Sequence, residues 1–250
     1  MPPNPQTLLD VTLNNLSVAG RNTYLHRMVY IGEHILPVQG KENIINIFER
    51  NIRQINEEYN DGVLTGFLLA YASLFVHVLE GTEASLLKHA KSFVEDIDKG
   101  HGETNEESPF IKKITRTKVI TVYHHIHQRE LSGWMGAAAR PLHTLARVGP
   151  EEDPAIHAAS CLAKMSRLLQ DIFSQPAESL RSTLRHLSSR AAEHLPEASL
   201  LDFLLGSPLL QSLPEHARLA DRFLQRTLFY QEHTWPVPLD LVPYSLFETQ

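Results

Sequence analysis

The chain has 250 residues, of which 42% are hydrophobic, which is enough to bury a core in one large or two small domains. Its 23 Lys and Arg residues stand against 29 Asp and Glu residues, and the net charge of -6 argues against nucleic acid or anionic lipid as partners. Cys161 is the only cysteine, which excludes an intramolecular disulfide and a cysteine-based zinc cluster and is typical of a reducing compartment. The sequence shows no basic and apolar leader and no stretch apolar over the ~20 residues of a membrane span, so we expect a protein of the cytoplasm or cytoskeleton that does not bind membranes.

The first third of the chain predicts a tail, a strand and a helix. Residues 1–22 are rich in Pro, Asn and Thr, and we expect an N-terminal tail that docks on another surface. The run from Tyr24 to Ile31 alternates and is rich in strand-forming residues, which predicts a first strand. From Lys41 to Tyr59, isoleucines and a phenylalanine recur at helical spacing, which predicts a crossover helix.

The most informative stretch is the run of twenty residues 62–81. Thr65 and Gly66 open one apolar run, a link of small residues follows, and a second apolar run ends at Glu80 and Gly81. Two apolar runs about a short link predict a buried β-hairpin.

Four further elements complete the predicted domain. Thr82 is placed to cap a second helix that runs through about Ile97. A charged loop at residues 98–108 follows, and then strands are predicted from Thr117 to Tyr123 and around residues 131–138.

The resulting order, β-α-β-β-α-β-β over about residues 23–140, predicts a mixed α/β (α+β) fold. It is ferredoxin-like, with a sheet of about five strands and two helices on one face. Residues 141–233 predict an α-helical extension, with one helix from Pro154 to Phe173 and shorter helices separated by prolines. Residues 234–250 contain three prolines and predict an extended C-terminal segment.

The hairpin, with its Thr-Gly start and Leu-Glu-Gly end, resembles the central hairpin of the BLUF family of flavin-binding blue-light sensors. The resemblance implies a flavin site made by a tyrosine on the first strand, an asparagine at the start of the second, a glutamine on the third and a tryptophan or methionine on the fifth. These positions fall on Tyr30, Asn60, His77 and Trp134, with Asn60 one residue out of the family's spacing. His77 replaces the glutamine, and an imidazole cannot reproduce the donor and acceptor geometry of a primary amide. We therefore expect no flavin or other cofactor; a flavin-binding blue-light or redox sensor is the alternative.

A closer resemblance is to testis-expressed protein 47 and its relatives, a eukaryotic BLUF-like group. It is carried by residues 124–134 (HHIHQRELSGW), Arg27-Met28, the Thr-Gly-x-Leu-Leu start of the hairpin, and residues 235–238 (WPVP). It implies a ciliary or flagellar protein of male germ cells with no assigned catalytic activity. On this basis we hypothesise a non-catalytic structural or adaptor component of the axoneme, whose partners are axonemal proteins or microtubule-associated complexes. A scaffold outside cilia is the third possibility.

Several polar residues permit both a functional and a structural interpretation. His124, His125 and His127 suggest a metal site, but on a strand only the last two share a face, and zinc uses three or four protein ligands. No metal site is therefore predicted. Tyr30 and His77 are read as a core aromatic and a hydrogen-bonded sheet histidine.

Arg129 is interpreted as a structural clamp, bracing a carboxylate such as Glu80 or stacking on Trp134. The sequence lacks the nucleophile elbow, phosphate-binding loop, dinucleotide fingerprint and zinc-protease motifs. Cys161 lies in an apolar helical pattern and is read as a small apolar residue. No catalytic residue is predicted, and we expect a protein that is not an enzyme.

Overall fold

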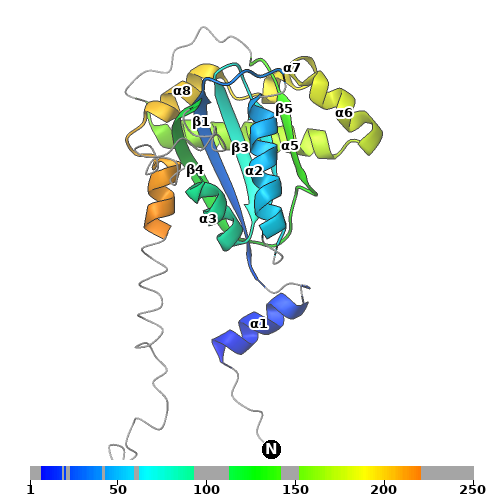
Figure 1. Ribbon diagram of the computed structural model, residues 1–250, viewed down its shortest axis with the longest axis vertical. Helices are drawn as coiled ribbons and strands as arrows, with labels where there is room; N and C mark the ends of the chain where they lie inside the picture. The colour runs from blue at the N-terminus through cyan, green and yellow to red at the C-terminus, as the bar shows by residue number, and fades with distance from the viewer. Residues whose placement is uncertain are drawn as a thin grey trace, which may run out of the picture.

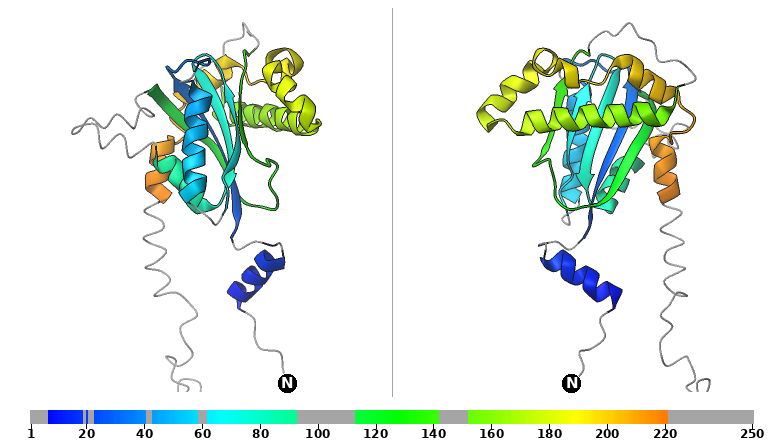
Figure 2. Two further views of the ribbon diagram at one scale, coloured as in Figure 1. Left: turned by 45° about the vertical axis from the view of Figure 1, so that its right-hand side comes forward. Right: turned by 180° about the vertical axis from the view of Figure 1, so that it is seen from behind.

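The computed structural model describes residues 7–18, 20, 23–40, 43–58, 62–92, 113–141 and 152–220. In these ranges a five-stranded sheet lies between two layers of helices (Figures 1 and 2). The strands are β1 Leu25–His34, β2 Thr65–Ala70, β3 Leu74–Gly81, β4 Ile114–Ile126 and β5 Trp134–Ala138. Their order is β4-β1-β3-β2-β5, with β5 parallel to β2 and the other neighbours antiparallel. This confirms the predicted mixed α/β class and the ferredoxin-like order, with a fifth strand added at one edge.

The central hairpin is buried along its whole length, as its continuous apolar pattern predicts. Every residue of β2 and β3 is buried, because helices cover both faces of the sheet. The backbone amide of Tyr71 donates to the carbonyl of Leu74 at 2.7 Å and closes the link between the strands.

Helices α2 (Ile44–Glu58) and α3 (Glu83–Lys91) cover one face (Figure 1). The isoleucine stripe of α2 lies against the sheet, and Thr82 caps α3 by accepting a hydrogen bond from the amide of Ser85, as predicted. The helical residues 213–220 lie on the same face, with Leu213 and Ala217 buried.

The other face carries the C-terminal helices. They are α5 Pro154–Phe173, α6 Ala177–Arg185, α7 Leu187–Arg190, the 3₁₀ helix η2 Ala192–His194 and α8 Ala198–Gly206. The bounds of α5 are the predicted ones because Asp153 accepts a hydrogen bond from the amide of Ala155 and Pro154 occupies the first turn.

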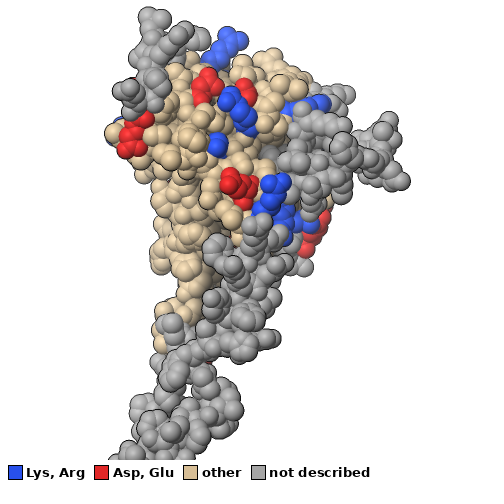
Figure 3. Space-filling model, turned by 90° about the vertical axis from the view of Figure 1, so that its left-hand side faces the viewer, with Lys and Arg blue, Asp and Glu red and all other residues tan. Residues whose placement is uncertain are grey.

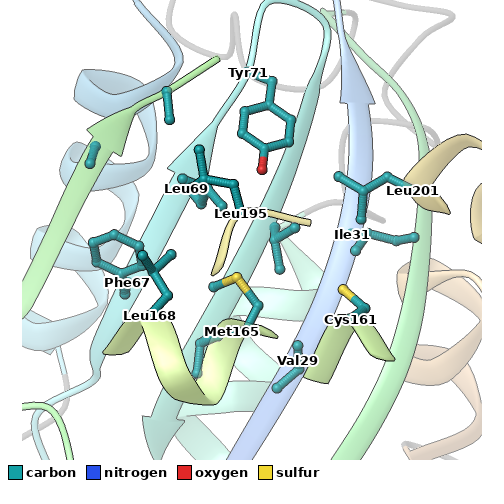
Figure 4. Packing of buried hydrophobic residues seen from close by; sticks show 14 of the residues in the cluster. Val29, Ile31, Phe67, Leu69, Tyr71, Cys161, Met165, Leu168, Leu195 and Leu201 are labelled. Carbon is teal, nitrogen blue, oxygen red and sulfur yellow. The ribbon is translucent and has the colours of Figure 1, made fainter. Parts of the chain in front are cut away.

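Helix α5 crosses the back of the sheet, as the right-hand view of Figure 2 shows. Cys161, Met165 and Leu168 point at Ile31 and Phe67 of the strands (Figure 4). Each side chain buried in this way contributes about 1.5–3 kcal/mol to the stability of the fold. Because these side chains share one core with the strands, the helical extension is a second layer on the same sheet.

The C-terminal chain also covers an edge of the sheet. The amide of Val119, on edge strand β4, donates to the carbonyl of Gln211 at 2.8 Å, and Lys118 Nζ donates to the carbonyl of Leu210 at 2.6 Å. These bonds satisfy part of an edge that would otherwise be open to pairing with another chain.

The remaining helix of the described structure precedes β1 in the sequence. Helix α1 (Leu8–Val18) lies within the range predicted as a tail, and Thr7 and Asp10 exchange the hydrogen bonds of a helix cap at its start. Asn60, the loop at residues 98–108 and the segment at residues 234–250 lie outside the described residues. In the part of the chain that is described, no helix is both long and apolar enough to cross a membrane.

Candidate functional site

Three of the four positions implied by the BLUF resemblance meet beneath α2 and α3. Tyr30 and His77 are direct partners in the β1–β3 register, and the Tyr30 hydroxyl lies 2.8 Å from His77 Nδ1. Trp134 Nε1 donates to His77 Nε2 at 3.0 Å. The fourth position, Asn60, lies outside the described residues.

Two residues that sequence reasoning missed complete the network. The Tyr30 hydroxyl lies 2.7 Å from His89 Nε2, and His89 Nδ1 lies 2.7 Å from Asn51 Oδ1. A signal for His89 was present, since it follows the buried Leu86 by three residues and so lies on the inner stripe of α3.

The network has one consistent direction of donation. Trp134 Nε1 can only donate, so His77 Nε2 accepts and the His77 proton lies on Nδ1. His77 therefore donates to the Tyr30 oxygen, and the Tyr30 hydroxyl donates to His89 Nε2. His89 then donates from Nδ1 to Asn51. Every link is satisfied when both imidazoles are neutral.

Burial keeps this network uncharged at neutral pH. Tyr30, His77 and His89 each have 0% exposure. Desolvation lowers the pKa of His77 well below its ordinary value, aided by the neighbouring His89, and lowers the pKa of His89 to about 3. Desolvation also raises the pKa of the Tyr30 hydroxyl. The arrangement can therefore tie α2 and α3 to the sheet, and its groups are withdrawn from solvent.

The residues present do not fit a flavin at this position. The Tyr30 hydroxyl bonds His77, which stands at the family's glutamine position, and it also bonds the imidazole of His89. The Phe48 ring lies with its centroid 5.0 Å from that of His77 and 6.2 Å from that of His89. Phe48 is also fully buried, so the described side chains fill the space beside the hydroxyl.

The Thr-Gly and Leu-Glu-Gly motifs have structural roles at the open end of the hairpin, away from the link at residues 71–73. The buried carboxylate of Glu80 accepts hydrogen bonds from Arg27 Nε at 2.8 Å and Arg27 Nη2 at 2.6 Å. It also accepts from the backbone amides of Glu130 and Leu131, each at 3.1 Å to Oε2. Glu80 therefore fixes the connection between β4 and β5 to the sheet.

Arg129 is a clamp, as predicted, but its partners differ from the expected ones. Its Nη1 donates to Thr65 Oγ1 at 2.9 Å and to the backbone carbonyl of Glu80 at 2.7 Å. The Glu80 carboxylate is held by Arg27 instead. Gly66 is required because an added Cβ would lie 2.6 Å from the carbonyl oxygen of Val78 and 3.0 Å from the Trp134 ring.

The predicted alternation of the three histidines after Tyr123 is wrong. Strand β4 ends at Ile126, so His127 lies outside it. The pairing with β1 shifts register between Leu25 and Arg27, and His125 adopts a left-handed backbone with φ of 58°. His124 and His125 consequently both approach β1, where His26 Nδ1 lies 3.1 Å from His124 Nδ1.

Two other candidate groups can be placed. Cys161 is fully buried, and desolvation raises the pKa of its thiol to about 12, which agrees with its reading as a small apolar residue. Within the described ranges, no group of three or more His, Cys, Asp and Glu side chains is arranged to hold a metal ion.

The sequence matches the testis-expressed protein 47 family over residues 24–219. Among solved structures, a bacterial light-regulated adenylyl cyclase is similar at 18% identity and a TM-score of 0.30, over 64% of this chain and 39% of that chain. The structure BlrP1 BLUF is similar at 19% identity and a TM-score of 0.27, over 46% and 64%. Klebsiella pneumoniae BlrP1 with FMN and cyclic diGMP gives 16% identity and a TM-score of 0.31, over 60% and 36%.

The chain thus spans less than two thirds of each of these structures. A search of the curated proteins found no match.

Proposed function

The chain belongs to the testis-expressed protein 47 family, and on that premise we propose that it is a non-catalytic structural or adaptor protein of the ciliary or sperm-flagellar axoneme. One observation carries the non-catalytic part. The Tyr30 hydroxyl bonds His89 in addition to His77, and the buried His89 and Phe48 side chains pack beside it where the BLUF resemblance implies a flavin.

The motifs that mark the family resemblance also support a structural role. Arg27, Glu80 and Arg129 are engaged in holding the β4–β5 connection to the hairpin. Gly66 lets that hairpin approach Trp134. These hydrogen bonds and close contacts keep the domain rigid, and a component of a larger assembly needs a rigid domain.

The charge distribution supports protein partners over nucleic acid or lipid. The net charge is -6, and the face in Figure 3 places Lys and Arg beside Asp and Glu on its described part, without a large patch of one sign. We infer that the partners are axonemal proteins or microtubule-associated complexes. Attachment to acidic tubulin surfaces by charge alone is disfavoured by the negative charge.

A tagged copy expressed in a ciliated cell tests this proposal. We expect it to localise along the axoneme, to stay with axonemes after detergent extraction and to resist moderate salt. A matched variant lacking residues 234–250 should stay folded but be retained less. The deleted segment carries Trp, Leu and Val side chains between prolines, and these suit docking into an apolar groove. Release of the intact chain into the detergent-soluble fraction contradicts the axonemal role and leaves a scaffold outside cilia.

A flavin-binding sensor remains as a second candidate function because Tyr30, His77 and Trp134 do meet in hydrogen-bonding contact. For this candidate, α2 and α3 would have to separate and His89 would have to turn away from the Tyr30 hydroxyl. Flavin absorbance of the purified chain distinguishes the two functions.

A further inference from the structure

A second histidine cluster lies beside α3, where the helix at residues 213–220 packs. A small cavity there is lined by side chains of four elements: His26 and Met28 of β1, Val122 and His124 of β4, Glu83, Leu86, Leu87 and Ala90 of α3, and His216 and Ala220 of the last described helix. Three imidazoles and one carboxylate therefore surround a mostly apolar space.

Over its described residues, the helix at residues 213–220 packs on the sheet through a small set of side chains. Leu213 and Ala217 are its buried apolar anchors. Before it, the amide of Leu213 donates to Thr117 Oγ1 at 3.4 Å, and Gln211 bonds the β4 edge. His216 lies half-buried between these anchors and faces the cavity. A segment at the edge of the fold that buries two apolar side chains belongs to the class of elements that open locally at a small cost in free energy.

The contact between His26 and His124 makes protonation of both rings unfavourable while the cluster is intact. Their Nδ1 atoms lie 3.1 Å apart, so one must donate and the other must accept. Protonation of both rings places two N–H groups and two positive charges face to face. The groups around them are His125, which meets the His26 ring edge-on at 5.4 Å, His216 across the cavity, and Glu83. Among the described residues that line the cavity, Glu83 is the one anion.

We propose that this cluster is a pH-sensitive latch: it holds the helix at residues 213–220 against α3 and β4 at neutral pH and releases it in mild acid. Release exposes Leu213 and Ala217 and lets His26 and His216 take up protons in water. The device is independent of the proposed function, since it needs only the geometry of the cluster.

The electrostatics agree in sign. Desolvation, with His124 second, lowers the pKa of both His26 and His216 in the docked state, while Glu83 acts in the opposite direction on His26. The released state therefore binds more protons below about pH 6.5, and a falling pH favours release. Each unit of lowered pKa changes the ratio of released to docked chains by up to about tenfold.

The distance between two spin labels tests the latch in the full chain. Glu57→Cys on α2 and Arg218→Cys on the helix place labels at exposed positions, and the buried Cys161 thiol does not compete. We expect one narrow distance population at pH 7.5 and, at pH 5.5, a broad and longer population in which the released fraction is several-fold larger. The double variant His124→Gln, His216→Gln should remove at least half of that rise.

Two controls separate the latch from general unfolding. A label pair at Glu57→Cys and Arg167→Cys, on α2 and α5, should keep its distance at both pH values. The variant His186→Gln should behave like the parent chain, because His186 is exposed at the end of α6 and is not part of the cavity lining. An unchanged 57–218 distance at pH 5.5, an equal change in the double variant, or parallel movement of the 57–167 pair overturns the proposal.

Discussion

The Tyr30 hydroxyl donates a hydrogen bond to His89 Nε2 across 2.7 Å and so joins the central sheet to α3. The same oxygen accepts from His77 Nδ1, which makes Tyr30 the middle of a chain that runs from Trp134 to Asn51. An aromatic side chain that the BLUF resemblance assigns to light sensing is thus a link in the core.

The first prediction is that Tyr30→Phe destabilises the chain by about 2–4 kcal/mol, because two buried imidazole nitrogens lose the hydroxyl and each loss costs about 1–3 kcal/mol. Urea unfolding followed by circular dichroism measures the change. The matched control is Tyr123→Phe, whose side chain is 45% exposed and which should shift stability by less than about 0.5 kcal/mol. Equal stabilities for the two variants would show that the network contributes nothing.

The second prediction concerns the Glu80 carboxylate. Glu80→Gln removes a fully buried charge from Arg27, and we expect a loss of about 2–3 kcal/mol, at the low side for buried pairs because Arg27 is partly exposed. Glu130→Gln is the control, since Glu130 contacts the same Arg27 at 3.2 Å with a side chain 48% exposed and should change stability by less than about 0.5 kcal/mol. If the Glu80→Gln chain is as stable as the control, the structural role of the Leu-Glu-Gly motif is contradicted.

The third prediction is a dependence of stability on pH. His77 and His89 are neutral in the fold and have lowered pKa values, so the unfolded chain binds more protons below pH 6.5. Stability is then fully present above pH 6.5 and falls as the pH drops toward the folded values, by about 3 kcal/mol from His89 alone near pH 4.5. The free energy of unfolding at pH 7.5, 6.0 and 4.5 checks this. His89→Gln should flatten the decline, and a wild-type curve flat from pH 7.5 to 4.5 contradicts the neutral network.

The fourth prediction is that a fragment ending at residue 140 aggregates or self-associates. Without α5, side chains such as Val29, Ile31 and Phe67 lose their cover, and an apolar face of this size is not stable in water. Light scattering and thermal melting of the fragment give the answer. A monomeric fragment that melts with the full chain would mean that the helices are an independent appendage.

Much of the fold could be predicted from the sequence because the decisive patterns are local. The apolar runs about residues 71–73 determine the hairpin, and Asp153 with Pro154 determines the start of α5. The site was predicted less completely. His89 lies on α3, and pairing it with Tyr30 requires the tertiary arrangement of α3 on β1, which no local pattern in the sequence gives. The histidines after Tyr123 were misplaced because simple alternation does not anticipate the register shift opposite Leu25.

Flavin binding by the purified chain tests the central claim most directly. The chain should be incubated with FAD and with FMN, desalted, and measured for absorbance near the flavin bands, beside a flavin-binding BLUF domain treated in the same way. The filled space around Tyr30, His77 and His89 predicts a colourless chain with no retained flavin and no spectral change under blue light. A yellow preparation with about one flavin per chain, shifting to the red on illumination, would contradict the account and establish the sensor.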